Sequence, residues 1–146
     1  MRRLACLPAL FACLLPLAQA ETPPTKPGVA IVEPSVDDRI LVGAEFVVTV
    51  RITVPKGSEP PTRVYADFHR GKVLAGQFAS YPARLKKVGD EEFECQVRVE
   101  SPKTPGDYTL KVSAHDKLVR ESDPRTALEF RRDGDDTWVL KAPVDD

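Results

Sequence analysis

Side chains that could bind a transition metal or act as a nucleophile are scarce in this chain. Outside residues 1–20, the only imidazole and thiol groups belong to His69, His115 and Cys95, and no methionine remains. Copper and zinc sites need several such donors converging on one point. Cys95 lies on the apolar side of an alternating stretch, so we expect a small buried hydrophobe and not a reactive thiol.

Motifs of known catalytic chemistry are also missing from the sequence. It contains no Gly-x-Ser-x-Gly elbow, no glycine-rich phosphate loop and no His-Glu-x-x-His helix. The carboxylate pairs Glu91-Glu92 and Asp135-Asp136 are adjacent in sequence, so within a strand they point to opposite faces. We therefore predict a protein that is not an enzyme and that has no catalytic residues, no cofactor and no bound metal.

Three aromatic side chains are candidates for contact with a partner: Tyr65, Tyr81 and Trp138. Tyrosine and tryptophan are enriched at interfaces because each combines a large apolar body with a polar group. Recognition loops usually lie at the ends of a rigid scaffold, and the longest candidates here are 55–61, the region of Tyr81, and 115–124.

The elements that must position these residues are short strands. Apolar and polar residues alternate with a period of two, which is typical of half-buried strands in antiparallel sheets, and no stretch shows helical periodicity. The predicted strands are 29–32, 45–54, 62–69, 73–78, 93–100, 108–114, 125–132 and 137–140, with shorter edge pieces within 35–42 and 84–88 and a loop or ragged hairpin over 115–124. This spacing predicts an all-β, antiparallel β-sandwich of about seven to nine strands.

The stretch from Gly106 to Asp116, GDYTLKVSAHD, resembles the tyrosine-corner strand of immunoglobulin-like and fibronectin type III-like domains. The resemblance extends over about residues 29–132. It implies an immunoglobulin-like sandwich in which the Tyr108 hydroxyl bonds the backbone a few residues upstream. The chain departs from antibody-type domains because it lacks their cysteine pair and core tryptophan. The motif recurs in domains of unrelated function, so it implies a fold and no activity.

An immunoglobulin-like fold would also separate the two histidines. Their strands would be antiparallel neighbours, and each histidine ends its own strand. The side chains of His69 and His115 would then lie at opposite ends of the sheet, too far apart to share an ion. We expect each to be a solvated loop residue.

The first twenty residues have the pattern of a secretory signal peptide. Arg2 and Arg3 precede the apolar run 4–17, and Ala18-Gln19-Ala20 forms a small-x-small cleavage site. An N-terminal anchor helix is one alternative. A second is a lipoprotein attached through Cys13, because Leu10-Phe11-Ala12-Cys13 resembles a lipobox.

The rest of the chain reads as one domain with short flanks. We predict a Pro-rich extended linker at 21–28, a sandwich domain at 29–141 and a short acidic tail at 142–146. Removal of residues 1–20 leaves 146 − 20 = 126 residues with 19 basic and 22 acidic side chains, a net charge of 19 − 22 = −3. A mildly acidic domain is a poor binder of nucleic acid. No transmembrane span is expected in the mature chain.

Together these patterns favour an exported protein, periplasmic or secreted, that is a non-enzymatic module. We expect it to act in protein interaction or assembly at the cell envelope, with another envelope or extracellular protein as its partner. The alternative is a periplasmic carrier of a small ligand or a metal. An enzyme is the third hypothesis, and no nucleophile–base pair supports it.

Overall fold

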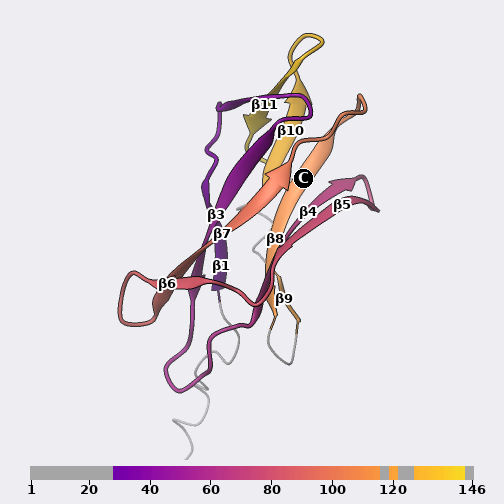
Figure 1. Cartoon of the computed structure of the whole chain (residues 1–146). Helices are drawn as coiled ribbons and strands as arrows, with labels where there is room; N and C mark the ends of the chain where they lie inside the picture. The colour runs from indigo at the N-terminus through magenta and orange to yellow at the C-terminus, as the bar shows by residue number, and fades with distance from the viewer. Residues whose placement is uncertain (1–27, 116–118, 122–126, 144–146) are drawn as a thin grey trace, which may run out of the picture.

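The computed structural model describes residues 28–115, 119–121 and 127–143, and these ranges form an all-β structure without a helix (Figure 1). Its eleven strands are β1 Gly28–Glu33, β2 Arg39–Leu41, β3 Glu45–Thr53, β4 Arg63–Arg70, β5 Val73–Ser80, β6 Leu85–Lys87, β7 Glu92–Glu100, β8 Tyr108–His115, β9 Val119–Glu121, β10 Leu128–Arg132 and β11 Thr137–Lys141. No helix in these ranges is long and apolar enough to cross a membrane.

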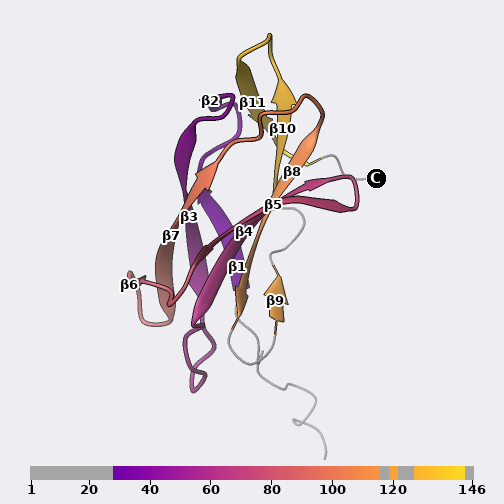
Figure 2. The same ribbon diagram turned by 45° about the vertical axis from the view of Figure 1, so that its right-hand side comes forward.

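The strands form two antiparallel sheets. One has four strands in the order β1-β3-β7-β6, and the other has seven, in the order β2-β11-β10-β8-β4-β5 with β9 also paired to β8. Figure 2 shows β3 and β7 of the first sheet beside β8 and β10 of the second. This arrangement is consistent with the two layers of a β-sandwich.

The core lies between the two sheets. Alternate residues of each strand point to opposite faces, and the apolar ones point into this space. Val48, Val50 and Ile52 of β3 are fully buried. The ring of Phe130 in β10 contacts that of Phe46 in β3, with centroids 5.9 Å apart, and so joins the two sheets. The buried members of the core are Val29, Val48, Val50, Ile52, Val54, Val64, Ala66, Phe68, Cys95, Val97, Val99, Tyr108, Leu110, Val112, Ala114, Leu128, Phe130, Trp138 and Leu140.

Trp138 corrects one expectation, because its ring lies in the core and not at a surface where a partner could contact it. None of its surface is exposed. Its ring packs against that of Tyr108, with centroids 5.4 Å apart, and its indole Nε1 donates a hydrogen bond to the Pro102 carbonyl oxygen at 2.9 Å. The pairing of β11 with β10 turns Trp138 and Leu140 inward, and this choice of face is a tertiary effect.

The tyrosine corner expected from Gly106 to Asp116 is present as a hydrogen bond. The Tyr108 hydroxyl donates to the carbonyl oxygen of Thr104 at 2.9 Å, four residues upstream. Tyr108 itself is buried at the start of β8. The bond holds the connection between β7 and β8 against the core.

The predicted strands correspond to observed ones, although their number is eleven and not seven to nine. The excess comes from three-residue strands: β2 and β6 fall within the predicted edge pieces, and β9 forms a short hairpin with β8 within 115–124. The predicted signal peptide with Cys13, most of the linker and the end of the acidic tail lie outside the described residues.

Candidate functional site

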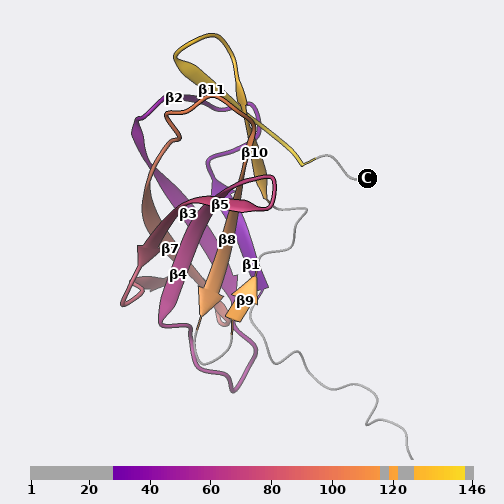
Figure 3. The same ribbon diagram turned by 90° about the vertical axis from the view of Figure 1, so that its right-hand side faces the viewer.

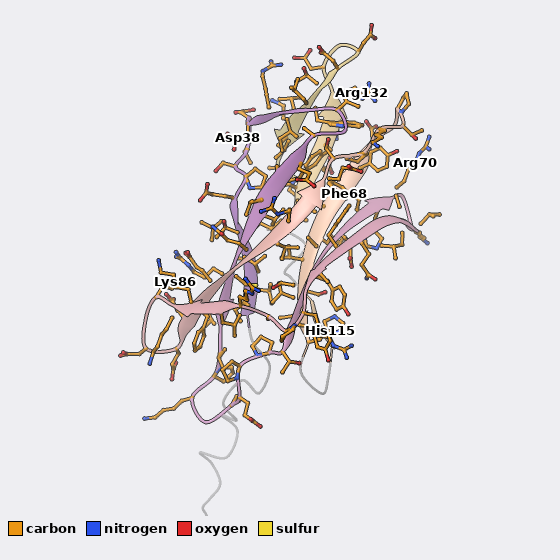
Figure 4. All side chains as sticks on the ribbon, in the orientation of Figure 1. Asp38, Phe68, Arg70, Lys86, His115 and Arg132 are labelled. Carbon is orange, nitrogen blue, oxygen red and sulfur yellow. The ribbon has the colours of Figure 1, made fainter. Side chains whose placement is uncertain are left out.

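Tyr65 and Tyr81, two of the aromatic residues singled out in the sequence, lie at one end of the larger sheet. The alternation of β4 turns Val64 inward and Tyr65 outward. Arg63 pairs with His115 at the end of β8, and Tyr81 directly follows β5, whose last residue pairs with Val64. Three neighbouring strands thus bring together Arg63, Tyr65, Tyr81 and His115, which we call the aromatic–arginine cluster. Figure 4 marks the position of His115 at this end of the sheet.

Direct contacts hold the cluster together. The guanidinium carbon of Arg63 lies 4.4 Å from the ring centroid of Tyr81, a cation–π geometry. The rings of Tyr65 and His115 meet edge to face with centroids 4.7 Å apart. The Nε2 atom of His115 is 3.2 Å from the Ser113 hydroxyl. Tyr81 nevertheless keeps 62% of its surface exposed, so the cluster is ordered and still faces solvent.

The electrostatics of the cluster keep Arg63 positively charged. Hydrogen bonding to Tyr81 is the largest cause that raises the pKa of Arg63 above its ordinary value, and hydrogen bonding to Tyr65 is the second. The cluster therefore presents a fixed cation framed by aromatic rings. The residue types of the cluster are those that carry binding energy at protein interfaces.

Two of the three aromatic residues expected to contact a partner, Tyr65 and Tyr81, belong to this cluster, and their role in binding stays a prediction. Trp138 is buried and cannot offer its ring to a partner in this structure. Arg63 and His115 were missed because their proximity to the tyrosines depends on strand register. His115 was expected to be a solvated loop residue, but it is half-buried and ends β8.

The two histidines lie far apart, as the sequence analysis anticipated. His69 pairs with Thr109, and Arg63, six positions earlier in β4, pairs with His115. At about 3.3 Å per residue this separates the two histidines by about 20 Å along the sheet. Both are half-buried strand residues, so the expectation of a loop position was wrong for His69 too. Within the described ranges, no group of three His, Cys, Asp or Glu residues could hold a metal ion.

Asp67 lies on the same face of β4 between these ends. Its Oδ1 atom is buried and has no hydrogen-bond partner among the described residues, and the same holds for Nδ1 of His69. Burial raises the pKa of Asp67, while a hydrogen bond to Gln77 and the charges of His69 and His115 act in the opposite direction. This half-buried carboxyl group is therefore incompletely solvated and incompletely paired.

Cys95 is buried, as the sequence predicted, with 1% of its surface exposed. Burial raises the pKa of its thiol, which disfavours the reactive thiolate. The residue packs in the core and takes no part in a surface site.

Two hollows open at the surface of the described structure. One of about 450 Å³ lies where β3 and β7 meet the 55–60 loop, and Val54, Lys56 and Phe93 contribute to its lining. The other, of about 220 Å³, lies between β5 and residues 100–104, over the rings of Phe68, Phe78 and Tyr108.

Comparison of the chain with models of protein families, with curated proteins and with solved structures finds no match. The structure defines an all-β protein of two antiparallel sheets.

Proposed function

We propose that this chain is an exported, non-enzymatic, immunoglobulin-like module that binds another protein of the cell envelope through the aromatic–arginine cluster. The observation that carries the proposal is the contact of Arg63 with the exposed ring of Tyr81, beside the Tyr65–His115 pair. Tyrosine and arginine recur at interface hot spots because they bury large contact areas with polar groups at defined positions.

Strand order supports the immunoglobulin-like assignment. Immunoglobulin constant-type domains have strands A, B, E and D in one sheet and C, F and G in the other. The order β1-β3-β7-β6 corresponds to A-B-E-D, and β10-β8-β4 corresponds to G-F-C, with β5 added beside strand C. The hydrogen bond from Tyr108 to Thr104 falls near the start of the strand that corresponds to F, where the tyrosine corner belongs.

The position of the cluster suits recognition of a protein surface. Arg63, Tyr65 and His115 project from paired strands and Tyr81 directly follows β5, so little conformational entropy is lost when these side chains are covered. The charge of Arg63 would favour a partner surface with carboxylate or carbonyl oxygens beside an apolar patch. The signal-like pattern of residues 1–20 supports export and therefore a partner in the envelope.

The proposal is tested by capture of partners from envelope extracts of the native host. The double variant Arg63→Ala/Tyr81→Ala should reduce the captured partner by about tenfold or more, the scale expected of a hot spot. The matched control is Arg98→Ala/Val47→Ala, because these two residues are cross-strand neighbours exposed on the other sheet. If both double variants lose the captured partner, or if neither does, the cluster is not the binding surface.

A small-ligand carrier is the second candidate, and the hollow beside the 55–60 loop favours it. Its volume of about 450 Å³ is within the range of ligand sites, and its lining combines Phe93 with Lys56 and Glu91. Native mass spectrometry of the protein recovered from its host is the test. A retained small molecule or metal would promote this candidate, and a bare protein mass would remove it.

A further inference from the structure

β5 is an edge strand of the seven-stranded sheet. It ends the order β2-β11-β10-β8-β4-β5, and β4 is the one strand with which it pairs among the residues described. Figure 1 shows β5 at the margin of the sheet, with the hairpin that joins it to β4 projecting from the body of the molecule, and Figure 3 shows the molecule with this side facing the viewer. One side of β5 therefore presents unpaired backbone N–H and C=O groups.

The sequence of β5 lacks the features that protect the other edges. Edge strands are usually shielded by charged side chains, proline or short length. Each of the other strands at a described sheet edge carries a charge: Glu33 in β1, Arg39 in β2, Lys86 and Lys87 in β6, and Arg120 and Glu121 in β9. β5, VLAGQFAS, runs for eight residues with no charged residue and no proline. It is thus the one described sheet edge suited to pairing with another strand.

Apolar exposure is concentrated at the same edge. Val73, the first residue of β5, and Tyr81, which directly follows the strand, are the two most exposed large hydrophobic residues of the described chain, at 68% and 62%, and Leu74 is 50% exposed. A bulge at Ala75 interrupts the ladder near the hairpin, because Phe68 pairs with Gly76 and His69 with Leu74. The regular stretch that remains is Gly76–Ser80, long enough for a typical strand pairing.

A hollow lies beside this regular stretch on its inner side. Gly76, Phe78, Phe68 and Tyr108 line it together with residues 100–104, and its volume is about 220 Å³. Glycine in a strand often marks a place where another backbone approaches closely. A strand added to β5 would direct alternate side chains into this hollow, over the ring of Phe78.

We propose that the added strand is β5 of a second copy, paired antiparallel over Gly76–Ser80 about a two-fold axis at Phe78. Directly opposite residues would be Phe78 with Phe78, Gln77 with Ala79, and Gly76 with Ser80. A two-fold pairing sets a strand against an identical strand, so a net charge on one strand meets the same charge on the other, and β5 carries no charge. The two Phe78 rings form an aromatic cross-strand pair above the hollow.

The pairing would join the two large sheets into one continuous sheet with a common outer face. Tyr65 lies opposite Ala79 on this outer face, so both aromatic–arginine clusters would be displayed on the same side of the dimer. A bivalent surface binds a multivalent partner more tightly without any new contact. The dimer itself does not rest on the proposed function, because it needs no partner.

The test is sedimentation of the protein as exported by its host, over a wide concentration range. We expect a concentration-dependent dimer, and Gln77→Lys should raise its dissociation constant at least about tenfold by placing a lysine at the open edge. The matched control is Gln96→Lys, the same change at an exposed position of β7 in the other sheet, which should leave the dimer intact. Circular dichroism and thermal unfolding establish that both variants fold.

A cross-linking experiment checks the register. An oxidised mixture of Gln77→Cys and Ala79→Cys chains should form a disulfide-linked heterodimer, because positions 77 and 79 lie directly opposite each other in the proposed register. The native Cys95 is buried and should not form a competing disulfide. A monomer at all concentrations, or a dimer unaffected by Gln77→Lys, would overturn the proposal. So would a monomer whose Gln77→Lys variant loses capture of an envelope protein, because β5 would then bind another protein's strand. The single cluster variant Arg63→Ala, which changes a residue of β4 outside the proposed contact, should still dimerise, and this separates the result from a failure of the proposed function.

Discussion

The Tyr108 hydroxyl donates a hydrogen bond to the carbonyl oxygen of Thr104, 2.9 Å away, and so closes the connection between β7 and β8 onto the core. Tyr108→Phe removes this bond and keeps the ring contacts with Trp138 and Phe68. We expect a loss of about 1 kcal/mol in the free energy of unfolding, measured by urea denaturation. Tyr81→Phe, at an exposed ring, should change stability far less. Equal stability of wild type and Tyr108→Phe would show that the bond is not formed in solution.

Removal of the buried indole should have a larger effect. Trp138→Ala leaves a cavity beside Tyr108 and Phe130 and deprives the Pro102 carbonyl of its donor. A loss of about 3–5 kcal/mol is expected. Because Trp138 is the one tryptophan of the chain, wild-type fluorescence should be blue-shifted when folded and move to the red on unfolding. Emission typical of a solvated indole in the folded protein would contradict the buried position.

Asp67 should make stability depend on pH. Burial raises its folded pKa above the ordinary 3.8, so the folded state binds the proton more tightly than the unfolded state does. Ionisation therefore destabilises the fold as pH rises through the folded pKa, and this penalty is absent below about pH 3.8. Asp67→Asn should be more stable than wild type at pH 7, and the difference should vanish at pH 3. Asp135→Asn, in an exposed loop, controls for the change of charge. If Asp67→Asn is less stable than wild type at pH 7, then ionised Asp67 does not destabilise the fold and the prediction is wrong.

The thiol of Cys95 offers a probe of core opening. Its burial predicts no reaction with a thiol reagent in the native protein and full reaction in denaturant. Intact mass after a short exposure to iodoacetamide, with and without urea, is the measurement. Rapid native labelling would mean that β7 is accessible from solution.

The fold was largely predictable because its signal is local. In β3 and β7, period-two alternation alone identifies Val50 and Val97 as core residues, and the structure buries both. Short strands gave a weaker signal. The alternation of Trp138 and Leu140 was visible in the sequence, but which face turns inward is set by the pairing of β11 with β10.

The candidate site was predictable only as separate residues. Tyr65 and Tyr81 stand out by type, but their contacts with His115 and Arg63 depend on how three strands align. No sequence pattern around Arg63 indicates that it is a binding residue. The open edge at β5 was equally hidden, because strand order is a property of the sheet and not of the eight residues themselves.

In the proposed function, a partner protein covers the aromatic–arginine cluster. A photo-crosslinking amino acid at position 81, in protein exported by the native host, tests it most directly, with the same group at position 47 on the other sheet as the control. We predict one specific cross-linked protein from position 81, lost on Arg63→Ala and not obtained from position 47. No cross-link at position 81, or the same products from both positions, would contradict the proposed interaction surface.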